Sequence, residues 1–132
     1  MPNNRLCLKD FLLIAEATLG VSCDELERTI CIFRTQSSLA APFVRVWGVY
    51  LFSDPVEQAA ICALRIIRTR PLPTGNKKVA YECMREMLLR SGLHWSRPEE
   101  DAEEIAETLI ALQARELPDA EFIRWVQSRV TA

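Results

Sequence analysis

The sequence has little of what several classes of protein need. It contains one histidine and four glycines in 132 residues, and 16 Lys and Arg against 18 Asp and Glu give a net charge of −2. A slightly acidic balance argues against general binding to nucleic acid or to anionic membranes, which requires a basic excess. No stretch approaches the ~20 apolar residues of a membrane span, and no basic region precedes an apolar run at the N-terminus. We therefore expect a soluble cytoplasmic protein without membrane or direct nucleic-acid partners.

Cysteine and histidine also lack the spacing of a metal site. No two cysteines form a C-x-x-C pair, which argues against a zinc site and against a disulfide framework. The five are Cys7, Cys23, Cys31, Cys62 and Cys83. We interpret them as reduced thiols, most of them in the core. The single histidine, His94, excludes a two-histidine metal site, and we interpret it as a surface or packing residue.

Helical periodicity is what the chain contains over most of its length. The 132 residues fit one domain, 1–132, and 49% hydrophobic with 26% charged residues is typical of a globular protein. Apolar residues recur at helical spacing in six segments. They cover 8–19, 22–33, 55–68 and 76–90, a segment capped by Ser96 with Glu99, and a segment that starts at Pro118 and Asp119. The stretch 37–55 is instead rich in β-branched and aromatic residues and predicts a short ribbon. The predicted fold class is an all-α bundle of about six helices with a short β ribbon.

The loop "RPLPTG" at 70–75 and the start of the helix after it concentrate positive charge. The cations are Arg65, Arg68, Arg70, Lys77 and Lys78, and no acid occurs from 65 to 81. The first turn of a helix offers free backbone N–H groups and the positive end of the dipole, and Gly75 allows close approach, so the segment suits a phosphate. The alternative is that the arginines complement a helix C-terminus and Gly75-Asn76 is only a turn and cap. A Walker loop is excluded, because the segment is not G-x-x-x-x-G-K-[ST].

Residues 70–78, "RPLPTGNKK", resemble the signature of the Fic/Doc family, H-x-F-x-[D/E]-[G/A]-N-[K/G]-R. The resemblance extends over nearly the whole chain. "LCLKDFLLIAEATLG" looks like the opening helix, "LERTICIFRTQSSLAAPF" like the second helix and its turn, and "VYLFSDPVEQAAICAL" like the flap and the helix before the motif. "KKVAYECMREMLLRSGL" is similar to the anchor helix, and the short C-terminal part suits the death-on-curing (Doc) branch of toxin–antitoxin proteins.

The resemblance implies a nucleotide, possibly with Mg²⁺, held at the loop, and transfer of AMP or phosphate to a hydroxyl of a target protein. It also implies a protein partner, either that target or an antitoxin. It assigns the general base to position 70, the Mg²⁺-binding acid to position 74 and phosphate contacts to Gly75 and Asn76. It assigns the outer phosphates to the position of the closing arginine, here Lys78, which forms a cationic pair with Lys77.

The sequence departs from the family pattern at the positions to which the motif assigns catalysis and metal binding. Arg70 stands at the base position, and a guanidinium does not accept a proton. Thr74 is a poor Mg²⁺ ligand beside a carboxylate, and Lys78 keeps the charge of the closing arginine without its bidentate geometry. The leading hypothesis is a catalytically impaired Doc-like protein that still binds ATP or another phosphorylated ligand, with a doubtful Mg²⁺ site. The alternatives are an interaction module without nucleotide binding, and an active transferase with an unusual catalytic apparatus.

Overall fold

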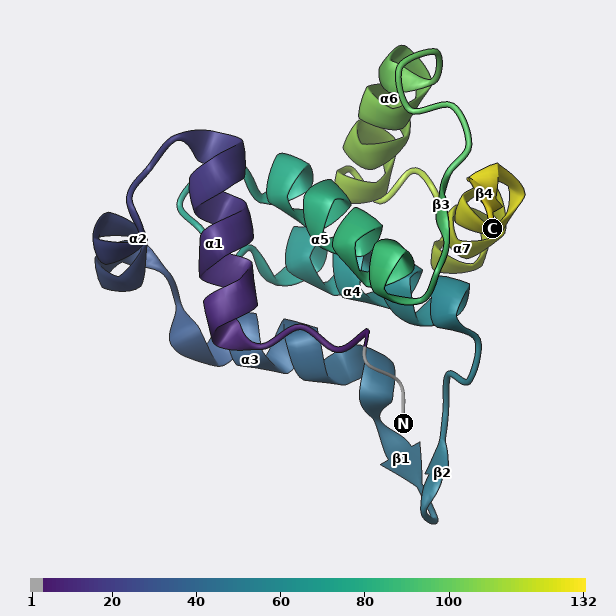
Figure 1. Cartoon of the computed structure of the whole chain (residues 1–132), viewed down its shortest axis with the longest axis horizontal. Helices are drawn as coiled ribbons and strands as arrows, with labels where there is room; N and C mark the ends of the chain where they lie inside the picture. The colour runs from purple at the N-terminus through teal and green to yellow at the C-terminus, as the bar shows by residue number, and fades with distance from the viewer. Residues whose placement is uncertain (1–3) are drawn as a thin grey trace.

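Seven α-helices and two small antiparallel sheets form the chain from residue 4 to residue 132, the part that the computed structural model describes (Figure 1). The helices are α1 (Leu8–Leu19), α2 (Cys23–Thr29), α3 (Ile32–Ala40), α4 (Pro55–Thr69), α5 (Asn76–Arg90), α6 (Ala102–Gln113) and α7 (Asp119–Arg129). A 3₁₀ turn, η1 (Ala41–Phe43), leads into the hairpin β1 (Arg45–Val46) and β2 (Val49–Tyr50), and β3 (His94–Trp95) pairs with β4 (Val130–Thr131). The predicted all-α bundle with a short β ribbon is confirmed.

The helices α4 and α5 lie side by side at the centre of the molecule (Figure 1). Helix α4 is apolar around most of its circumference, and its buried alanines, such as Ala59 and Ala63, let the neighbouring backbone come close. Helix α5 buries a stripe that includes Val79, Cys83 and Met87. Because α1 covers α5 while α3 and α7 cover α4, this pair fixes where the connecting loop lies.

Several start and stop signals act as the sequence predicts. Gly20 ends α1 in the left-handed conformation, and its N–H donates to the carbonyl of Glu16. Ser22 and Asp54 cap the helices that follow them by accepting hydrogen bonds from backbone N–H groups of the first turn. None of the helices among residues 4–132 combines the length and the apolar character that a membrane crossing requires.

The predicted helix over 22–33 is wrong in its extent. It is divided into α2 and α3, because Ile30 is extended at φ −74° and ψ 154°. The backbone N–H of Cys31 donates instead to the carbonyl of Pro71, at 2.9 Å, so a contact from a distant loop replaces a helical hydrogen bond. The predicted ribbon also begins too early, because 37–40 continue α3 and the strands occupy only 45–50.

The predicted capping pattern of Ser96 with Glu99 is also wrong. The N–H of Ser96 donates to the carbonyl of Arg129, beside the β3–β4 pair, and α6 begins only at Ala102.

The cysteines are reduced, but they are less buried than expected. Cys62 and Cys83 lie in the core, Cys23 is half-buried, and Cys7 and Cys31 are exposed.

Candidate functional site

The loop between α4 and α5 is shaped by two residues in the left-handed region. Arg70 ends α4 at φ 52°, with its N–H donating to the carbonyl of Ile66, and Gly75 precedes α5 at φ 82°. Leu72 is buried between them and anchors the loop in the core, whereas Pro73 and Thr74 face solvent. Arginine rarely adopts a positive φ, and strained backbone of this kind is frequent at binding sites.

Gly75 is required by its surroundings as well as by its backbone angle. A Cβ atom at this position would lie 2.5 Å from Cδ2 of Leu19, which is far closer than a van der Waals contact. Leu19 is the last residue of α1, so α1 sits directly against the start of α5. The missing side chain therefore serves the packing of α1 against the start of α5.

Asn76 holds the loop closed with its side-chain amide. Its Oδ1 accepts from the N–H of Leu72 at 3.0 Å, and its Nδ2 donates to the carbonyl of Leu72 at 2.9 Å. The side chain is 6% exposed. The resemblance implies a phosphate contact for Asn76, but its amide is directed inward to Leu72, so the group it can offer a ligand is its backbone N–H.

The first turn of α5 is open at its N-terminus. No side chain among residues 4–132 caps it, and no acid lies in the first turn. Residues 76–78, whose backbone N–H groups have no partner within the helix, line a hollow of about 520 Å³. The hollow is lined by Leu19, Arg70, Pro73, Thr74, Gly75, Asn76, Lys77, Lys78 and Gln113. The structure thus brings together the motif positions 70 and 74–78, and it adds Leu19, Pro73 and Gln113. Arg65 and Arg68, which the sequence also associates with the loop, do not line this hollow.

The three cations of the hollow differ in how freely they can meet a ligand. The ammonium of Lys77 donates to Oε1 of Gln113, on α6, at 2.6 Å. Arg70 and Lys78 are exposed, and neither makes an ion pair within residues 4–132. Two exposed cations without an ion pair and one cation bonded to Gln113, beside the uncapped start of α5, form an arrangement that favours a negatively charged group.

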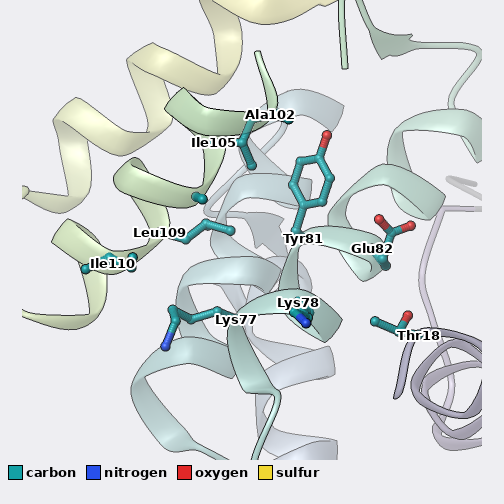
Figure 2. A pocket seen from close by; sticks show the side chains of 10 residues that line it. Thr18, Lys77, Lys78, Tyr81, Glu82, Ala102, Ile105, Leu109 and Ile110 are labelled. Atoms are coloured by element: carbon teal, nitrogen blue, oxygen red, sulfur yellow. The ribbon is translucent and has the colours of Figure 1, made fainter. Parts of the chain in front are cut away.

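A second hollow, between α5 and α6, adjoins the first (Figure 2). Its volume is about 330 Å³, and Lys77 and Lys78 line both hollows. Figure 2 shows Leu109 extending from α6 toward Tyr81 on α5. The Tyr81 hydroxyl finds no hydrogen-bond partner among residues 4–132, and burial raises its pKa, so it stays protonated. An apolar surface one helical turn from a cationic one fits a ligand with a planar apolar part and an anionic part.

Magnesium ion fits the loop poorly. The residue at the motif's acid position, Thr74, offers one neutral hydroxyl, and no carboxylate lies between 65 and 81. No three side chains of His, Cys, Asp or Glu converge within the described residues 4–132. Mg²⁺ prefers carboxylate and phosphate oxygen, so a bound metal would depend on the oxygens of the ligand.

Other positively charged or catalytic candidates lie away from the hollow. Arg68 forms an ion pair with Asp119 at 2.6 Å and so joins α4 to α7. His94 is exposed on β3, beyond the far end of α5, whose 15 residues span roughly 22 Å. This position supports a surface role for His94 and removes it from proton transfer at the loop.

The β1–β2 hairpin lies elsewhere than the resemblance implies. A flap belongs beside the motif loop, but the hairpin leads into the N-terminal end of α4, whereas the loop follows the C-terminal end (Figure 1). Helix α4 has 15 residues, so roughly 22 Å separates the two. The hairpin therefore does not cover the hollow in this structure.

Sequence reasoning missed the residues that reach the site from other helices. Leu19 is 56 positions before Gly75, and Gln113 is 36 positions after Lys77. Neither has a local pattern that marks it, because tertiary packing alone brings it to the loop.

Comparison of the chain with protein-family models, with curated proteins and with solved structures gave no match in any of the three.

Proposed function

We propose that this chain is a Doc-like member of the Fic/Doc family that binds a nucleotide or another phosphorylated ligand and transfers phosphate or AMP slowly or not at all. The single observation that carries the proposal is the open N-terminus of α5. Residues 76–78, at the uncapped start of that helix, line a hollow together with Arg70. Phosphate binds such a helix end through its N–H donors and the helix dipole.

A purely structural loop explains part of this geometry and leaves part unexplained. It accounts for Gly75 and Asn76, which serve packing and loop closure. It does not account for cations in the first turn of α5, where acids are the stabilising residues. A bound anion explains them, because it offsets the charge of the lysines.

Catalysis is expected to be weak because the hollow has no group suited to proton transfer. Arg70 occupies the position of the general base and cannot accept a proton. A positioned base contributes roughly 10²–10⁴ in rate. With Thr74 as the counterpart of the metal-binding acid, charge stabilisation by Mg²⁺ is weakened as well.

Two rival functions lead to different measurements. An active transferase would use Arg70 to stabilise charge and would take its base from the target or the nucleotide, so it would label a target protein. An interaction module would bind no nucleotide and would act through a protein surface. In the leading proposal, the protein partner is a target or an antitoxin in the cytoplasm.

Calorimetric titration with ATP, AMP and GTP, with and without Mg²⁺, tests the proposal. We expect binding by the wild-type protein and a loss of roughly tenfold in affinity for Lys78→Ala, which removes one charge-assisted contact. Lys9→Ala is the matched control, because Lys9 is an exposed lysine on α1 that does not line the hollow. Absence of binding at millimolar nucleotide by a folded protein, or equal affinity of both variants, would reject the phosphate site.

A further inference from the structure

The hairpin carries its apolar side chains on one face. Arg45 is paired with Tyr50 and Val46 with Val49, and the N–H of Leu51 donates to the carbonyl of Val44 at 3.0 Å. Side chains alternate between the two faces of a strand. The first face therefore holds Arg45 and Tyr50, whose side chains bond at 2.6 Å, and the second holds Val44, Val46, Val49 and Leu51.

The second face is not covered by the rest of the chain. Its four side chains are between 43% and 68% exposed, although all are large and apolar. A two-stranded sheet is marginally stable unless a third element covers its apolar face. Something outside residues 4–132 of this copy is therefore the natural cover.

Trp47, at the tip of the hairpin, is a large apolar residue that is even more exposed. Its side chain is 97% exposed, and its φ is 55° beside Gly48 at φ 78°. The turn belongs to the type that favours Asn or Gly where Trp47 stands. A bulky residue in this conformation costs free energy, and no contact within the described chain offsets that cost.

A hollow of about 690 Å³ opens at the base of the same face. Val44 and Leu51 belong to both the face and the hollow, so the two surfaces are continuous. The other apolar lining residues include Phe43, Phe52, Ile61 and Leu64, and the polar lining residues are Arg5, Ser37, Arg65 and Asp119. A surface that combines large apolar side chains with a few polar and charged ones is typical of a protein–protein contact.

We propose that two copies of this chain associate through their hairpins about a two-fold axis, each placing Trp47 in the hollow of the other. Face-to-face packing of the two apolar faces in opposite directions brings each tip over the opposite base. The distance from tip to base is the same in both copies, so both indoles are seated at once. A two-fold contact of this kind needs one self-complementary surface, which the face and its hollow provide.

The chemistry of the hollow suits an indole. A buried Trp N–H requires an acceptor, and the lining of the hollow offers the Ser37 hydroxyl and the Asp119 carboxylate. Arg65 makes no ion pair within residues 4–132, so its guanidinium is available to lie on the ring. The charged residue of the hairpin, Arg45, lies on the opposite face and does not enter the contact.

Such a dimer depends on concentration. The apolar face, Trp47 and the lining of the hollow comprise fewer residues than the roughly 20–30 per side of a standard stable interface. Sedimentation velocity of the full chain, from low micromolar to near-millimolar concentration, is expected to show a monomer that shifts to a dimer. Trp47→Ala should raise the dimer dissociation constant by about thirty-fold, the size of a strong interface contact.

Two further variants keep the test decisive. Ala40→Trp fills the hollow from an exposed position on its lining while leaving Trp47 in place, and it should weaken the dimer as much as Trp47→Ala does. Phe33→Ala is the matched control, because Phe33 is 80% exposed on α3 and lines no part of the hollow, and its dimer should be unchanged. A wild-type protein that stays monomeric at every concentration, or a dimer that persists in Trp47→Ala, overturns the proposal.

Discussion

Both the backbone conformation and the packing of the loop require a glycine at position 75. Its φ of 82° favours glycine, and an added Cβ would meet Leu19 at 2.5 Å. We expect Gly75→Ala to lower the free energy of unfolding by about 1–2 kcal/mol for the left-handed backbone and by a further, smaller amount for displacing the Leu19 side chain. Urea unfolding followed by circular dichroism measures the sum.

Gly20 separates these two contributions. Its φ is 71°, but a Cβ there would meet nothing within 4 Å. Gly20→Ala should therefore show the backbone cost alone, and the difference between the two variants gives the cost of the contact with Leu19. Equal destabilisation by both substitutions would show that the α1 contact contributes nothing.

At this scale the sequence singles out residues of the loop but does not reveal which contacts they make. Gly75 and Asn76 stand out from their spacing and residue type, and the structure places both at the loop. The amide of Asn76 is bonded to Leu72, four residues before it, and the glycine is required by Leu19. A local pattern does not reveal these contacts, because the partners are chosen by the path of the loop and by the packing of α1.

Between elements, the ion pair of Asp10 with Arg90 joins the start of α1 to the end of α5 at 3.1 Å. Burial raises the pKa of Asp10, but the N–H of Cys7 and the guanidinium of Arg90 outweigh it, so the pKa lies below its ordinary value. We expect Asp10→Asn to lower the free energy of unfolding at pH 7 by about 1 kcal/mol, the usual contribution of a carboxylate that bonds a helix start.

The pH dependence of that loss follows from the sign of the shift. A carboxyl whose pKa is lower in the folded state stabilises fully above its unfolded pKa of about 3.9, and this contribution disappears as the pH falls through the folded pKa. The difference between wild type and Asp10→Asn should therefore shrink below about pH 4. Glu100→Gln serves as control, since the pair of Glu100 with Arg97 is exposed and contributes little. A difference that stays constant from pH 7 to pH 3 would contradict the assignment.

Elements with strong apolar periodicity were predictable, and elements made by distant contacts were not. The helices α1, α4 and α5 agree with the predicted 8–19, 55–68 and 76–90 to within one residue. The division between α2 and α3 depends on a bond to Pro71, and β3 forms only because β4, 36 residues later, lies beside it. Long-range pairing of this kind leaves no periodic signal in a short segment.

At the scale of the whole molecule, the proposed function implies that the hollow can hold a nucleotide without the groups that catalyse transfer. We expect no measurable AMP or phosphate transfer by wild type. The variant Arg70→His/Thr74→Asp/Lys78→Arg should label lysate proteins or itself from α- or γ-labelled ATP with Mg²⁺, because it supplies a base and a metal ligand. Histidine tolerates the left-handed backbone of position 70. Arg70→His alone should label less, because no carboxylate would hold the metal.

The other outcomes of this experiment decide between the functions. Strong labelling by wild type would favour the active transferase. A triple variant that binds ATP, folds and labels nothing would favour the interaction module. In that case the hairpin is the first surface to test for binding to a target protein, because it lies at the far end of α4 from the loop.

The closure of the loop by Asn76 has a consequence for how this protein can evolve. Gly75 and Asn76 are required for packing and for closing the loop, so selection for a folded chain is enough to preserve both. Positions 70, 74 and 78 carry exposed side chains, so substitutions there leave the hydrogen bonds that close the loop intact. The fold therefore constrains positions 75 and 76 more tightly than positions 70, 74 and 78, whatever the loop binds.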